Sequence, residues 1–189
     1  WESQPCFSSD GKSLYFIRGT VRQGRKNPAE QDIYVTQIAD DGTWTTPVRV
    51  PGKINTPYRE ESVMIHPDGN TIYFSSNGHP GMGGLDIYVS HKEHDGTWGT
   101  PVNLGYPINT YNNENSLLVS AKGDLAFFAS DREGGMGSLD LYSFELPEEF
   151  RPTRTTHVRG LVYDAVTKKH LPAHFKLIDL ATGKVVKEA

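Results

Sequence analysis

Apolar and polar residues alternate in the middle of the chain over short runs that turn signals separate. Residues 85–93 begin with apolar Leu85, Ile87 and Val89 at every second position, which is the period of a strand with one drier face. Residues 62–66 are a short apolar run, residues 70–76 are rich in aromatic and β-branched side chains, and a Pro-Asp-Gly turn lies between them. Residues 98–105 form a proline-interrupted run that suits a sheet edge. The pattern predicts four strands and no helix, with a glycine-rich loop over residues 76–84.

This stretch recurs along the chain at an interval of 54 residues. Trp44 returns as Trp98, and the Ile-Asn-Thr run at 54–56 returns at 108–110. An Asp-Ile-Tyr run at 32–34 returns twice, the second time as Asp-Leu-Tyr. A four-stranded unit repeated at this period is typical of β-propeller blades, whereas a β-sandwich predicts no fixed interval. We therefore predict an all-β protein.

Residues 1–150 are predicted to hold three four-stranded blades of about 54 residues, which form an incomplete ring. A propeller usually closes with about four to eight blades, so we expect further blades upstream of Trp1. The third copy lacks the tryptophan-containing fourth strand. Either residues 149–153 serve as a degenerate fourth strand, or a strand from the region before Trp1 completes the sheet.

Several residues recur at matching positions of the copies and are predicted to be structural. The recurring Tyr-Phe pairs are expected to pack between neighbouring blades, and the tryptophans under the outer strand. The recurring aspartates are expected to cap the turn before a strand by accepting bonds from backbone N–H groups. These structural repeat positions are Asp32, Asp86, Asp140, Trp44 and Trp98.

The second copy resembles the PD40 type of WD40-like repeat found in TolB-like propellers. The resemblance rests on Asp68-Gly69, Tyr73-Phe74, the Ser-Ser-Asn run at 75–77 and the Asp-Ile-Tyr run at 86–88. The third copy has Lys122-Gly123 in place of Asp-Gly, and the first copy lacks the glycine-rich loop.

The repeat stops after residue 150, and residues 151–157 are predicted to be a linker. Residues 158–189 are expected to form strands at 158–164, at 173–180 and from 184 onward. They resemble the start of a carboxypeptidase-regulatory-like β-sandwich, on the strength of Val158, Gly160, Val162, Asp164, Thr167, residues 171–173, Thr182 and Gly183. PD40 blades followed by such a sandwich resemble Bacteroidetes-type OmpA-family proteins, which include a component of the type IX secretion machinery.

Composition narrows the class of protein. Hydrophobic residues make up 36% of the chain and charged residues 22%, which is typical of a folded globular protein. A net charge of −4 gives no general attraction for nucleic acid, which we do not expect as a partner. Cys6 is the single cysteine, so no internal disulfide can form. No apolar run approaches the length of a transmembrane segment.

The sequence favours a protein without catalytic, cofactor-binding or metal-binding residues. The Asp-Gly-Thr-Trp turns at 41–44 and 95–98 differ from sialidase Asp-boxes, which are themselves structural turns. A propeller peptidase would be followed by a hydrolase domain with a G-x-S-x-G motif, and that motif is not present. A weak metal site at His91, His94 and Asp95 is less favoured than a solvated turn. A calcium site among Asn77, Asp86, Asp131 and Glu133 lacks the dense oxygen ligands of dedicated calcium loops.

The loops between strands are the remaining candidates for function. Residues 78–86 and 132–140 share the pattern G-M-G-x-L-D, and two interpretations of it stay open. The glycines and aspartate serve turn geometry, or the loops gather on one rim and present methionines to a partner. The first loop carries four basic residues that either dock an acidic partner or stay solvated. The candidate partner-binding residues are Arg18, Arg22, Arg25, Lys26, His79, Met82, Arg132 and Met136.

The family resemblance implies a non-catalytic protein-interaction scaffold of the bacterial periplasm, associated with the outer membrane. Its partners would be outer-membrane or periplasmic proteins, and a domain outside this chain would bind peptidoglycan. The alternative is a propeller-type glycan-binding protein or a hydrolase of the sialidase or propeller-peptidase type.

Overall fold

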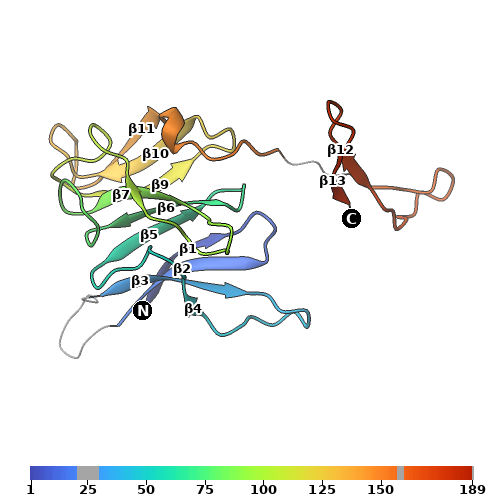
Figure 1. The fold of residues 1–189 in the computed structure, drawn as a ribbon, viewed down its shortest axis with the longest axis horizontal. Helices are drawn as coiled ribbons and strands as arrows, with labels where there is room; N and C mark the ends of the chain where they lie inside the picture. The colour runs from blue at the N-terminus through green and yellow to red at the C-terminus, as the bar shows by residue number, and fades with distance from the viewer. Residues whose placement is uncertain (21–29, 157–159, 189) are drawn as a thin grey trace. The chain divides into compact units, whose positions relative to one another are not determined.

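The computed structural model describes residues 1–20, 30–156 and 160–188, which divide into two compact units, Trp1–Thr155 and Thr156–Ala189 (Figure 1). Every element among these residues is a strand except one turn of 3-10 helix, η1 (Glu148–Phe150). Among the described residues, no helix is long and apolar enough to cross a bilayer.

The described residues of the first unit form three separate sheets, and the strands of each sheet follow the order of the chain. The first sheet has β1 (Glu2–Phe7), β2 (Ser13–Gly19), β3 (Gln31–Gln37) and β4 (Val48–Arg49). The second has β5 (Glu60–Ile65), β6 (Thr71–Ser76), β7 (Asp86–His91) and β8 (Val102–Asn103). The third has β9 (Glu114–Val119), β10 (Leu125–Ser130) and β11 (Asp140–Glu145). All neighbouring strands in these sheets are antiparallel, which confirms the all-β prediction.

The three sheets stack on one another (Figure 1). Apolar side chains pack between them. Tyr15, Ile17, Ile33, Ile72, Phe74, Tyr88 and Trp98 lie between the first and second sheets. Tyr73, Ile87, Val89, Leu117, Val119 and Phe128 lie between the second and third. Because side chains alternate along a strand, Phe74 serves one interface and its neighbour Tyr73 the other. Burying a side chain of this size stabilises the fold by about 1.5–3 kcal/mol.

The tryptophans differ between copies, which corrects one expectation. Trp98 is buried between the first two sheets, whereas the matching Trp44 is 44% exposed. Gly52 is part of the reason, since a Cβ there would lie 2.2 Å from the carbonyl oxygen of Trp98. Trp44 lies on the first sheet's other face, which no further sheet of the described residues covers. The local sequence is the same, and the neighbouring sheet decides the burial.

The third sheet has three strands among the described residues, and residues 149–153 do not add a fourth. Residues 148–150 form η1 instead, so that alternative is wrong. Phe150 packs against the core between the second and third sheets, and its carbonyl accepts a bond of 2.6 Å from the Tyr73 hydroxyl. The guanidinium Nε of Arg151 donates to the Leu146 carbonyl at 2.6 Å. These contacts hold the segment away from the outer edge of β11.

Over residues 160–188, the second unit has β12 (Lys176–Ile178) paired in a hairpin with β13 (Val185–Glu188). The expected strand at 158–164 begins outside the described residues, and its described part forms a single bridge from Tyr163 to His170. The strand expected at 173–180 is shorter than predicted because Asp179 accepts the N–H groups of Ala181 and Thr182 in a turn. The β-sandwich assignment stays a prediction.

Candidate partner-binding loops

The repeated Ile-Asn-Thr segment clasps the outer edge of a strand. In the second sheet, Asn109 accepts the Ile87 N–H at 2.8 Å and donates to the Ile87 carbonyl at 2.8 Å. In the first sheet, Asn55 accepts the Ile33 N–H at 2.7 Å and donates to the Ile33 carbonyl at 3.0 Å. One amide thus satisfies both polar groups of a buried strand residue, beside the two-residue outer strand. The segment recurs because each of these sheets needs its edge closed.

Two buried glutamates extend this clasp, and sequence reasoning missed both. Glu60 and Glu114 are fully buried and occupy matching positions at the start of β5 and β9. Glu60 accepts from the Thr56 N–H at 3.1 Å, the Thr56 hydroxyl at 2.8 Å and the Ser76 hydroxyl at 2.8 Å. Glu114 makes the same contacts with Thr110 and Ser130. Their signal is the recurring spacing N-T-x-x-x-E.

The two glutamates differ in their cationic partner. Arg132 donates to Glu114 at 3.3 Å. The residue 54 positions before Arg132 is Gly78, where a Cβ would lie 1.9 Å from the Thr56 hydroxyl, so no side chain fits. Burial raises the pKa of Glu60 against the effect of its hydrogen bonds. Among the described residues, the buried carboxyl of Glu60 is therefore held by neutral donors.

The G-M-G-x-L-D loops are shaped by their aspartates. Asp86 accepts the N–H groups of Met82 and Gly83 at 2.9 and 3.3 Å, and Asp140 accepts those of Met136 and Gly137 at 2.7 and 3.1 Å. Side-chain atoms at Gly81 and Gly135 would collide, since a Cβ would lie 2.0 and 2.2 Å from these carboxylates. The loops are fixed from inside and leave Met82 49% and Met136 100% exposed. Asp32 differs because it forms an ion pair with Arg49.

Three of the candidate residues lie over matching aromatic pairs. The Arg18 guanidinium is 5.3 Å from the Phe16 ring and 4.9 Å from the Tyr34 ring. The Arg132 guanidinium is 4.8 Å from Phe128 and 5.0 Å from Tyr142. Such contacts stabilise by about 0.5–2 kcal/mol.

His79 takes this place in the second sheet. Its ring lies 5.7 Å from the Phe74 ring and 5.3 Å from the Tyr88 ring. Its Nε2 is 2.8 Å from the Ile54 carbonyl, and Arg132 donates to the matching Ile108 carbonyl at 2.6 Å. These candidates therefore hold the scaffold, while the two methionines face outward. Arg22, Arg25 and Lys26 lie outside the described residues.

The Asp-Gly-Thr-Trp segments form the same turn twice. Asp41 accepts from the N–H and hydroxyl of Thr43 at 2.9 and 2.7 Å, and Asp95 does the same with Thr97 at the same distances. These hydrogen bonds lower the pKa of both aspartates. In the described ranges no three His, Cys, Asp or Glu side chains are placed to hold one metal ion.

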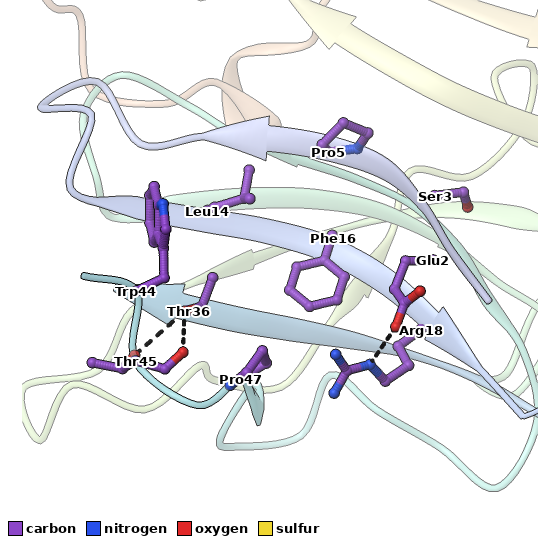
Figure 2. Close-up of a pocket in the computed structure, with 10 residues that line it drawn as sticks. All are labelled: Glu2, Ser3, Pro5, Leu14, Phe16, Arg18, Thr36, Trp44, Thr45 and Pro47. Atoms are coloured by element: carbon purple, nitrogen blue, oxygen red, sulfur yellow. Dashed lines mark hydrogen bonds and ion pairs between the residues drawn. The ribbon is translucent and has the colours of Figure 1, made fainter. Parts of the chain in front are cut away.

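A cavity of about 440 Å³ lies on the first sheet (Figure 2). Its lining is largely apolar, and Glu2 and Arg18 form an ion pair of 3.1 Å at one end. Leu14 and Phe16 face this cavity from β2, on the side opposite to Tyr15 and Ile17. The lining residues are Glu2, Ser3, Pro5, Leu14, Phe16, Arg18, Thr36, Trp44, Thr45 and Pro47. The matching face of the second sheet is buried under the first sheet, so the cavity is the uncovered counterpart of an internal interface.

Comparison with known proteins bears on the fold alone. No protein-family model and no curated protein matches the chain. A puromycin-hydrolyzing peptidase of Mycobacterium tuberculosis is 15% identical over 78% of this chain and 22% of its own, with a TM-score of 0.50.

Two further solved structures have lower TM-scores. TolB from Acinetobacter baumannii is 16% identical over 78% of this chain and 30% of its own, with a TM-score of 0.44. The periplasmic gluconolactonase PpgL of Pseudomonas aeruginosa is 13% identical over 68% of this chain and 36% of its own, with a TM-score of 0.42. The chain thus spans between 22% and 36% of these three proteins. The stacked sheets and the peptidase likeness support a β-propeller fold.

Proposed function

We propose that the protein is a non-catalytic interaction scaffold whose stacked sheets present the Met82 and Met136 loops to a partner protein. The observation that carries the proposal is the contrast within these loops. Their polar side chains bond the loop backbone, while the two methionines point to solvent. A rigid loop with exposed methionine loses little entropy on binding, and methionine is enriched at protein interfaces.

The partner and location follow from the family resemblance of the sequence. We assign the protein to the periplasm, in association with the outer membrane, as an OmpA-family lipoprotein component of the type IX secretion machinery similar to PorE. Outer-membrane or periplasmic proteins are its partners, and a domain outside this chain binds peptidoglycan. Further blades would complete the ring and cover the cavity face of the first sheet.

Capture from a bacterial envelope fraction tests the proposal. We expect outer-membrane or periplasmic proteins to co-purify with the parent protein and with Lys122→Ser, at the opposite end of the sheets. The double variant Met82→Ser, Met136→Ser should lose most of this capture because its contact side chains are shortened. Equal capture by both variants, or turnover of glycoside or peptide substrates by the parent protein, would contradict the proposal.

A further inference from the structure

Methionine is a residue type that both rim loops, residues 78–86 and 132–140, present to solvent. The chain has three methionines. Met136 is fully exposed and Met82 is 49% exposed. Met64 lies in β5, is only partly exposed and packs against the core between the second and third sheets. Two of the three thioethers are therefore open to small reagents in solution, and the third provides an internal reference.

The exposure of Met82 does not depend on the ends of the chain, because its loop is packed on both sides. On one side, the Gly84 N–H donates to the Asn112 carbonyl at 2.9 Å, shortly before the third sheet begins. On the other side, Nε2 of His79 is 2.8 Å from the Ile54 carbonyl, in the segment that follows the first sheet. Met82 is thus half-exposed with a sheet on either side of its own, and its accessibility belongs to the loop itself.

Oxidation of these side chains leaves the loop backbones in place. The backbone N–H groups of Met82 and Met136 donate to the carboxylates of Asp86 and Asp140 at 2.9 and 2.7 Å. The exposed methionine side chains take no part in these bonds. An oxygen atom added to the sulfur therefore changes the surface that a partner meets and not the fold beneath it. It converts a flexible apolar side chain into a polar one, which an apolar contact disfavours.

The thiol of the chain is less open to the same reagents. Cys6 is half-buried, and its Sγ accepts the Ile65 N–H at 3.4 Å. Burial raises the pKa of the Cys6 thiol, so the reactive thiolate is scarce at neutral pH. A thioether needs no ionisation to react, so accessibility decides its rate. Accessibility favours the two methionines of the rim loops.

We propose that Met82 and Met136 are oxidation sites at which a hydroperoxide switches off partner binding by the rim loops. This assignment rests on the scaffold function and names how that function is regulated. In the step, the thioether sulfur takes an oxygen atom from the hydroperoxide. The S–O bond forms and the O–O bond breaks, so the sulfur is oxidised and the hydroperoxide is reduced to water or an alcohol. A methionine sulfoxide reductase reverses the step with a dithiol, which becomes a disulfide as the oxygen leaves in water.

Tandem mass spectrometry of the protein after graded exposure to hydrogen peroxide locates the added oxygen residue by residue. We expect Met136 and Met82 to gain one oxygen atom each before Met64 does. Urea unfolding of the protein oxidised at these two residues should match that of the untreated protein. Oxidation of Met64 first or at the same rate, or a lower stability of the oxidised protein, would overturn the proposal.

Capture from a bacterial envelope fraction then measures the switch. Peroxide is removed before the treated protein meets the envelope fraction. We expect capture to fall about tenfold and to recover after treatment with a methionine sulfoxide reductase. Unchanged capture by the oxidised protein, or no recovery after reduction, would count against the switch.

Two double variants assign the effect to the rim loops. Met64→Leu, Cys6→Ala keeps sulfur only in the rim loops and should lose capture on peroxide treatment as the parent protein does. Met82→Leu, Met136→Leu carries apolar side chains of similar volume without a thioether. Peroxide should therefore leave the capture by this second variant at its own untreated level. The opposite pattern would place the sensitive group outside the rim loops and overturn the assignment.

The two proposals fail separately. If the untreated protein captures envelope proteins through Met82 and Met136 and the oxidised protein captures them equally, the regulation alone is wrong. If both methionines oxidise first while envelope capture by the untreated protein is absent or indifferent to them, the failure lies in the proposed function of the rim loops.

Discussion

At the scale of single residues, asparagine and glutamate side chains make the hydrogen bonds that recur from one repeat to the next. Asn109 is fully buried and bonds both polar groups of Ile87, so its loss leaves the buried Ile87 N–H without an acceptor, while the Ile87 carbonyl keeps only the Leu104 N–H at 3.1 Å. We expect Asn109→Ala to lower the free energy of unfolding by about 1–3 kcal/mol. Asn70→Ala is the control, because Asn70 is exposed on a turn. Urea denaturation measures both, and equal effects would contradict the clasp.

Glu60 gives a prediction about pH. Its pKa is raised in the folded protein above the ordinary value of 4.5, so the folded state binds this proton more tightly than the unfolded chain. The stabilisation is fully present below pH 4.5 and is lost as pH rises through the folded pKa. We expect the parent protein to lose stability relative to Glu60→Gln as pH rises from 4.5 to neutrality. Parallel stability curves would contradict this expectation.

The sequence predicts only some of the residues that form these hydrogen bonds. The recurrence of Ile-Asn-Thr is plain, but the glutamate four positions after threonine looks like an ordinary surface charge. Its burial depends on Thr56 and Ser76, which lie on different segments and meet only in the folded sheet. Repeat spacing could have identified it, whereas composition and periodicity could not.

At the scale of elements, glycine decides the shape of the methionine loops. Gly81 and Gly137 lie in matching kinds of loop, but only at Gly81 would an added Cβ collide with the capping aspartate. We expect Gly81→Ala to lower the free energy of unfolding by about 1–3 kcal/mol through the collision with Asp86. Gly137→Ala meets nothing within 4 Å and should be near neutral. Chemical denaturation of the two variants tests the comparison, which fails if they are equally stable.

The strands themselves were predictable because one dry face and two-residue periodicity repeat in each copy. The missing fourth strand of the third sheet was visible as a missing Thr-Pro-Val run, but the fate of residues 149–153 was not. Phe150 packs into a core that β6 and β10 build together, and no local pattern within five residues encodes that core. The type of each element follows from its local sequence, whereas its position in the fold depends on residues far away along the chain.

At the scale of the whole molecule, stacking gives one repeat position two different energies. Ile72 is fully buried between two sheets, whereas the matching Leu14 is half-buried and lines the open cavity of the first sheet. We expect Ile72→Ala to cost about 2–5 kcal/mol and Leu14→Ala less than half as much. Thermal and urea unfolding of both variants provide the test. Equal losses would mean that the face carrying Leu14 is covered in solution.

The most direct measurement of the scaffold function is site-specific photocrosslinking in an envelope preparation. A photoreactive residue is placed at Met82, at Met136, or at Lys122 on the loop at the opposite end of the sheets. Met82 and Met136 are exposed on loops whose backbones are bonded by Asp86 and Asp140. We therefore predict crosslinks to an outer-membrane or periplasmic protein from positions 82 and 136 and none from position 122. Equal crosslinking from all three positions, or none from the methionine positions, would contradict a partner-binding rim.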